Sequence, residues 1–222
     1  MEKKRKIIII GESHSQAPLV AMRAKIELPK GVDLVIHRLT KIKNGKLIGS
    51  IAFKDTLVLC STLDKDDLVI STIGGNQHAA LSLIQHPQPF DTVGNNGELP
   101  EPSESGAPEI VPRNALKAIF ETSFRTNDGK RILAIANAGP QRTVHLMAPP
   151  PKDDVAHILR KVEADFAAKG IMEKGVSPAP MRLRIWNIQN EVLGAVLVGK
   201  LWDKLPIVVR NTESHPANFP GK

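Results

Sequence analysis

The amino-acid sequence predicts an α/β domain in which a parallel sheet of about five strands is covered by helices on both faces. Its 222 residues are enough for one domain with a proper core. Its 41% hydrophobic and 24% charged residues are typical of a globular protein. Short apolar runs alternate along the chain with segments of helical periodicity, which is the pattern of parallel sheets whose strands are linked by helices.

The first half of the chain contains three of the expected strands. Residues 6–10 form a β-branched apolar run without polar alternation, typical of a strand buried on both faces of a sheet. The other two strands are expected at 32–36 and 67–73, and the helices at 17–24 and 78–84. Asn44-Gly45 marks a turn, and the segment 48–59 fits either a helix or a strand.

The second half begins with residues 87–112, which are rich in Pro, Gly, Ser, Asn and Glu and predict a long surface excursion such as a lid or a binding loop. A helix at 114–125 is closed by Asn127-Asp128-Gly129, and strands follow at 143–147 and 205–209. Two more helices are expected, one closed by Gly170 and one at 183–198, with Trp186 in core packing. Their apolar faces hold Val155, Ile158, Leu159, Val162 and Phe166 in the first helix, and Ile185, Ile188, Val192 and Val196 in the second.

The net charge of +7 raises the question of an anionic partner. The basic residues are scattered, and the densest run, residues 3–6, is most simply a solvated flank of the first strand. No aromatic residues interleave with them to form a base-stacking platform, which argues against nucleic-acid binding. A basic interaction protein recruited through residues 3–6 and 41–46 is the weakest of the functional hypotheses.

The remaining composition points to a cytoplasmic protein without a membrane span or a cofactor. The single cysteine, Cys60, excludes a disulfide framework and lies in an apolar run typical of a buried thiol. The apolar run 7–10 is too short for a signal-peptide core, and no segment approaches the roughly 20 apolar residues of a membrane span. The spacing of Glu12, His14, His78 and His86 fits no metal-binding pattern, so no metal is expected.

Three chemically useful residues follow predicted strands. Ser13 comes after the first strand, Asn76 after the third and His215 after the fifth. The simplest interpretations are a helix cap for Ser13 or Ser15 and a turn for Asn76. However, the carboxyl ends of parallel strands gather at one edge of a sheet. A serine, a histidine base and an amide donor at one edge would suit acyl transfer.

The blocks Gly11-Glu12-Ser13 and Gly74-Gly75-Asn76, together with His215, resemble those of the SGNH (GDSL-like) hydrolases. The resemblance implies a flavodoxin-like three-layer fold and a small-molecule ester as substrate. It makes Ser13 the nucleophile and His215 the base, with Glu12, His14 and His78 near the site. The oxyanion hole would combine the Ser13 backbone N–H, Asn76 and a glycine after the second strand, either Gly45 or Gly49, with Gly49 preferred.

The sequence departs from this family next to the histidine. The acid that usually stands three residues before it is replaced by Thr212. Glu213 or the more distant Asp203 could take its part, or a backbone carbonyl could hold the ring of His215 and leave a Ser–His dyad. The short segment after His215 also lacks the family's closing helix. The alternative function is therefore a weakened or inactive SGNH-fold protein that binds a small acyl or glycan ligand.

Overall fold

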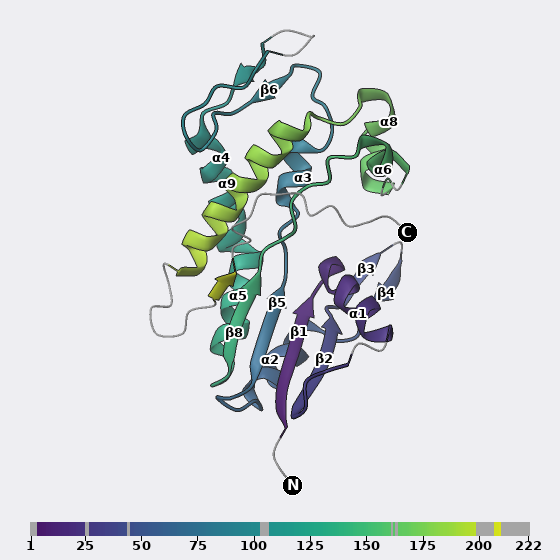
Figure 1. Ribbon diagram of the computed structural model, residues 1–222, viewed down its shortest axis with the longest axis vertical. Coiled ribbons are helices and arrows are strands. Elements are labelled where there is room, and N and C mark those ends of the chain that lie inside the picture. The colour runs from purple at the N-terminus through teal and green to yellow at the C-terminus, as the bar shows by residue number, and fades with distance from the viewer. Residues whose placement is uncertain are drawn as a thin grey trace.

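The β-branched run near the N-terminus forms an interior strand of the sheet. In the computed structural model it forms β1 (Arg5–Gly11), which pairs in parallel with β2 (Val32–Arg38) on one side and with β5 (Leu68–Thr72) on the other (Figure 1). The structure describes residues 4–24, 27–43, 45–102, 107–160, 162, 164–198 and 207–209.

Two more strands extend the sheet beyond β5. These are β8 (Arg142–Leu146) and β9 (Ile207–Val209), both parallel to their neighbours, so the strand order is β2-β1-β5-β8-β9. This is the order of flavodoxin-like folds, which confirms the predicted fold class. The chain reverses its direction of travel across the sheet between β1 and β5, and ligands of such sheets bind at the carboxyl ends of the strands at that point.

Helices link the strands. A short 3-10 turn, η1 (Ser13–Ser15), and α1 (Gln16–Arg23) follow β1, while α2 (Phe53–Ser61) precedes β5 and α5 (Asp128–Asn137) precedes β8. The helices α2 and α5 contact each other. Because parallel crossovers are right-handed, α1 belongs on the opposite face of the sheet from these two helices.

A second group of helices lies above the sheet in Figure 1, past the carboxyl end of β5. In it α9 (Ala179–Val198) packs against α3 (Gln77–Ser82), α4 (Arg113–Thr126) and α5. The predicted inward face of α9 is confirmed. All four predicted residues, Ile185, Ile188, Val192 and Val196, are buried.

The turn signal at Asn127-Asp128-Gly129 was expected to close a helix, but it joins two helices. Asn127 leaves the helical conformation with φ −123° and ψ −102°, and α5 starts at the next residue. Gly129 is buried so close to α4 that a Cβ there would lie 2.7 Å from the backbone oxygen of Phe124. The glycine therefore allows close packing at the junction, and the expected loop is helix α5.

Most of the segment 48–59, which fitted either a helix or a strand, is helix α2, and the expected surface excursion contains two short strands. A hairpin of β3 (Lys41–Lys43) and β4 (Lys46–Ile48) precedes α2. Within 87–112, two short parallel strands, β6 (Phe90–Asp91) and β7 (Glu109–Ile110), pair with each other. Arg184 Nε on α9 donates to Asp91 at 2.9 Å, which attaches this region to the helical group.

The helix expected before Gly170 is shorter than predicted. The structure has α6 (Val155–Arg160) and α7 (Ala164–Ala168), followed by α8 (Ile171–Lys174). No residue of α6 is fully buried, so its apolar positions gain less of the tertiary packing that stabilises most helices. Gly170 has φ +82°, the left-handed conformation expected of a glycine that ends a helix.

The apolar run that contains Cys60 packs against the core of the protein. Cys60 is fully buried, as predicted, and burial raises the pKa of its thiol to about 11. It is therefore a packed, protonated side chain at neutral pH. Among the helices of the described residues, none combines the length and the apolar composition that a membrane span needs.

Candidate functional site

The turns after β1 and β5 meet at the edge of the sheet where the strand order reverses. Gly11, the last residue of β1, is buried against Thr72, the last residue of β5. A Cβ on Gly11 would overlap Thr72 Oγ1, so a glycine is needed for the two strand ends to approach this closely. The residues that follow, beginning with Ser13 and Asn76, are thereby placed on neighbouring turns.

Ser13 is the first residue of η1 and is exposed. Its hydroxyl makes no side-chain cap of either η1 or α1, and neither does that of Ser15, so the helix-cap interpretation is wrong. Ser15 is buried instead, and its Oγ donates to the backbone oxygen of Glu12 at 2.7 Å. Ser15 is therefore held in place and stabilises the turn, whereas Ser13, two residues before it, is exposed to solvent.

Asn76 faces this turn from the end of β5. Its Oδ1 lies 3.1 Å from Nε2 of His14, the residue that follows Ser13. Asn76 stands at the N-terminus of α3 but forms no side-chain cap there. With the Nε2 tautomer of His14 donating to Oδ1, the Nδ2 amide group of Asn76 stays available to donate to another acceptor. The two turns are joined by this contact.

The two candidate glycines of the oxyanion hole occupy different places. Gly45 lies in the turn of the β3–β4 hairpin with open space around its Cα. Gly49 has φ +113°, and a Cβ there would lie 2.6 Å from the backbone oxygen of Leu39. Leu39 in turn donates its N–H to the oxygen of Gly11 at 2.8 Å. Gly49 therefore packs on the segment that contacts the end of β1, whereas Gly45 lies in the hairpin turn.

His78 is buried beneath the Asn76 turn, where its interactions are structural. Its Nδ1 lies 3.0 Å from the backbone oxygen of Gly75, and its backbone N–H donates to Gln189 Oε1 at 2.7 Å. Gln189 Nε2 also donates to Gly75 O at 2.9 Å. Burial lowers the pKa of His78, against the opposing effect of the hydrogen bonds that its ring makes with Gln189 Oε1 and Gly75 O. The histidine and Gln189 together hold the backbone from which Asn76 projects.

A polar chain that the sequence did not reveal connects the two turns from the α5 side. Arg131 Nη1 pairs with Glu12 Oε1 at 2.8 Å and with Asp128 Oδ1 at 3.8 Å. Asp128 accepts a hydrogen bond from Gln77, which is adjacent to Asn76. Burial raises the pKa of Asp128, although Gln77 and Arg131 oppose this shift. These polar contacts hold the Ser13 and Asn76 turns in place. The sequence does not predict them, because Arg131 and Asp128 belong to α5, which was expected to be a loop.

His145 is a second functional-looking residue that the sequence analysis missed. It lies on β8 with its Nδ1 3.4 Å from Ser71 Oγ of β5, and its buried Nε2 meets no partner within the described part of the chain. Burial, with a smaller contribution from His14, lowers its pKa from 6.5 to about 4. Its place inside an apolar strand is the only sequence signal, and that signal does not distinguish it from other strand residues.

The depressed pKa of His145 predicts a stability that falls in acid. Between pH 6.5 and 4 the unfolded chain binds this proton and the folded protein does not, so the free energy of unfolding decreases as the pH falls through that range. A shift from 6.5 to about 4 corresponds to about 3 kcal/mol, all of it present above pH 6.5. Urea unfolding at pH 7 and pH 4 measures the loss.

The control for this measurement is a pair of variants. His145→Asn should have a pH dependence about 3 kcal/mol smaller than the wild type, because it removes the buried titration. His86→Asn, at an exposed histidine, should keep the wild-type dependence. The conclusion that His145 is buried and neutral in the folded protein would be contradicted if His145→Asn lost stability in acid as steeply as the wild type.

The predicted base lies outside the described residues. This holds for His215, for Thr212 at the position of the family's acid, and for the two candidate acids, Glu213 and Asp203. The structure thus places Ser13 and Asn76 on two turns joined by the His14–Asn76 contact, and Gly49 against Leu39, which bonds to the end of β1. It also shows Glu12 and His14 acting on this turn through Arg131 and Asn76 respectively.

Within the described ranges, no three His, Cys, Asp or Glu side chains lie together as a protein metal site would need. Comparisons with protein-family models, with curated proteins and with solved structures find no match to this chain. A proposal about function therefore depends on the geometry of the two turns and on the motifs that they carry.

Proposed function

We propose that this protein is a serine acyl hydrolase that cleaves a small-molecule carboxylic ester, with Ser13 as its nucleophile and His215 as its base. One observation carries the proposal. Ser13, an exposed serine without a structural partner in the described chain, directly precedes His14, whose ring occupies the side-chain oxygen of Asn76. Both lie at the carboxyl edge where the strand order reverses. The resemblance to SGNH hydrolases supports the same assignment.

The reaction would proceed through an acyl-enzyme. Ser13 Oγ attacks the ester carbonyl carbon while His215 takes the hydroxyl proton. The oxyanion of the tetrahedral intermediate accepts hydrogen bonds from Asn76 Nδ2 and from the backbone N–H groups of Ser13 and Gly49. Collapse of the intermediate breaks the bond to the alcohol, which leaves with the proton from His215. Water then attacks the acyl group, and the same base takes its proton and returns one to Ser13.

The surroundings of Ser13 suit this role because they hold the donors in place before a substrate arrives. His14 occupies Asn76 Oδ1, which leaves the amide N–H groups to face an oxyanion. Arg131 holds Glu12, the residue before Ser13, and the Asp128–Gln77 contact holds the residue after Asn76. Preorganised donors of this kind are the largest single contribution in many enzymes, because they need no reorientation during the reaction.

Covalent labelling tests the proposal directly. The folded protein is treated with a fluorophosphonate probe, digested with trypsin and analysed by fragmentation mass spectrometry. The tryptic peptide 7–23 contains both Ser13 and Ser15, so Ser15 serves as an internal control. We expect the adduct on Ser13 and none on the buried Ser15. Labelling no faster than that of urea-unfolded protein would refute the proposed nucleophile.

Replacing Asn76 by Ala should lower the kcat of ester hydrolysis by about 10²–10³, the usual effect of removing one oxyanion donor. The KM should change little, because the donor acts on charge that develops in the transition state. Steady-state kinetics with p-nitrophenyl butyrate measure both constants. Asn96→Ala, at an exposed loop position, is the matched control and should retain full activity. Equal kcat values for the two variants would exclude Asn76 from the oxyanion hole.

A further inference from the structure

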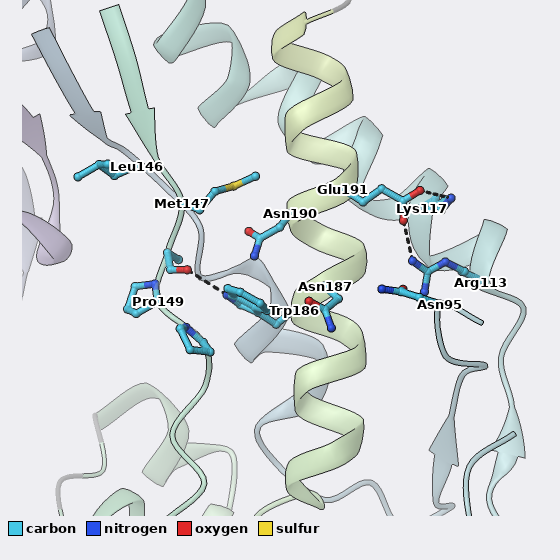
Figure 2. A pocket seen from close by; sticks show the side chains of 12 residues that line it. Asn95, Arg113, Lys117, Leu146, Met147, Pro149, Trp186, Asn187, Asn190 and Glu191 are labelled. Atoms are coloured by element: carbon cyan, nitrogen blue, oxygen red, sulfur yellow. Dashed lines mark hydrogen bonds and ion pairs between the residues drawn. The ribbon is translucent and has the colours of Figure 1, made fainter. Parts of the chain in front are cut away.

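A pocket of about 900 Å³ lies between α9, α4 and the segment that leaves β8 (Figure 2). Trp186, Asn187 and Asn190 of α9 line its centre. Neither Ser13 nor Asn76 borders it, so it is distinct from the proposed hydrolase site. Its volume is in the range of small-molecule sites, which combine an apolar surface with a few convergent polar groups.

Two residues that line this pocket each have a buried polar atom that meets no partner in the described chain. They are the acceptor Asn190 Oδ1 and the donor Arg113 Nη1. Buried polar groups are nearly always hydrogen-bonded, and leaving one unpaired costs about 1–3 kcal/mol. If these two side chains turn toward the pocket, a ligand that brings both a hydrogen-bond donor and an acceptor would satisfy the two atoms at once.

The centre of the pocket offers a fixed aromatic surface. Trp186, which the sequence analysis assigned to core packing, is only half-buried and borders the pocket instead. Its Nε1 donates to the backbone oxygen of Ala148 at 3.1 Å, which holds the indole between α9 and the segment carrying Pro149 (Figure 2). Met147 and Pro149 add apolar surface on the same side. Such a surface suits the C–H face of a ring.

The charged end of the pocket is largely neutralised. Glu191 pairs with Arg113 at 2.6 Å and with Lys117 at 2.5 Å, and these cations hold the pKa of the Glu191 carboxyl below its ordinary value. Two cations and one carboxylate leave a net charge of only +1. A phosphate dianion would have to compete with Glu191 for both cations. Hydroxyl groups can bind the paired side chains without breaking them apart.

We propose that this pocket is a saccharide-binding site. A sugar ring would stack its C–H face on Trp186, donate a hydroxyl proton to Asn190 Oδ1 and place a hydroxyl oxygen against Arg113 Nη1. The three amide side chains that border the pocket, Asn95, Asn187 and Asn190, can each both donate and accept, as vicinal hydroxyl groups require. The inference goes beyond ester hydrolysis and does not depend on it.

Binding is tested with the full-length Ser13→Ala variant, so that hydrolysis cannot consume a ligand. The probes are an immobilised array of neutral hexose, N-acetylhexosamine and hexuronate oligosaccharides, with AMP in solution as a nucleotide of comparable size. We expect retention on at least one oligosaccharide, with a Kd that rises at least about tenfold in Trp186→Ala. Leu183→Ala, at an exposed position of α9 outside the pocket, should bind as the parent does. Binding of AMP alone, or of none of these probes, would overturn the proposal.

Asn190→Leu separates a binding role from a structural one, because leucine has a similar size and no polar atom. If Oδ1 awaits a ligand, its removal should weaken saccharide binding at least about tenfold while the urea midpoint stays unchanged or rises. Isothermal titration calorimetry with the oligosaccharide found on the array gives the first quantity. A lowered midpoint with unchanged affinity would show that Asn190 serves the fold and would overturn its assignment to the ligand.

Discussion

The Ser13→Ala variant is expected to lose at least about 10³-fold in kcat/KM for ester hydrolysis, since removing the nucleophile of a serine hydrolase leaves only the contribution of the oxyanion hole and binding. The side chain is exposed and lacks a structural partner in the described chain, so its truncation should leave the fold intact. Surface substitutions of this kind usually change stability by no more than about 0.5 kcal/mol. The loss is measured with a panel of p-nitrophenyl esters.

Two comparisons make this result specific. Ser61→Ala removes a hydroxyl from an exposed position at the end of α2, which precedes the amino end of β5 and not the carboxyl end that carries the Asn76 turn, and should keep wild-type kinetics. Circular dichroism and the urea midpoint of Ser13→Ala should match those of the wild type. A folded Ser13→Ala protein that hydrolyses the panel as fast as the wild type would exclude Ser13 as the nucleophile and favour the ligand-binding alternative.

Phe124→Ala is expected to destabilise the protein by about 3–5 kcal/mol, the usual cost of truncating a buried aromatic residue. Phe124 is fully buried on α4 and stacks on Phe120 with the ring centroids 6.3 Å apart. The α4 helix packs along α9, so the cavity would open where the two helices meet. Because total stabilities are about 5–15 kcal/mol, a loss of this size is readily measured by urea unfolding at pH 7.

Ile119→Ala is the matched control on the same helix. Ile119 is 51% exposed, so its truncation should change the free energy of unfolding by no more than about 0.5 kcal/mol. The difference between the stability losses of Phe124→Ala and Ile119→Ala identifies the buried face of α4. Similar losses in the two variants would mean that this face is assigned to the wrong side of the helix.

Much of the fold could be predicted because its signals are local. A β-branched run without alternation predicted β1, and apolar residues at helical spacing predicted the buried face of α9. The same local reading failed at Asn127-Asp128-Gly129. There a turn signal marks a sharp junction between α4 and α5, and only the packing of Gly129 against Phe124 distinguishes it from a loop.

The candidate site could be predicted in part. Ser13 and Asn76 were singled out by their places after strands, and they lie on the turns that follow β1 and β5. Gly49 was preferred over Gly45 only through the resemblance to SGNH hydrolases, and it lies against Leu39, just after β2. The ion pairs of Arg131 that hold the Ser13 turn could not be predicted, since Arg131 lies on α5, which was expected to be a loop. Nor could His145, because its burial and lowered pKa follow from its neighbours in three dimensions.

The sequence by itself determined the layered α/β architecture and the strand ends that carry polar residues, because hydrophobic periodicity and turn residues act over a few positions. Only the tertiary structure decided which of those residues meet. His14 contacts Asn76 across 62 positions, and Arg131 reaches Glu12 across 119. Contacts so distant along the chain depend on strand order and helix packing, which join the turn of Ser13 and His14 to that of Asn76 and make a pocket around Trp186.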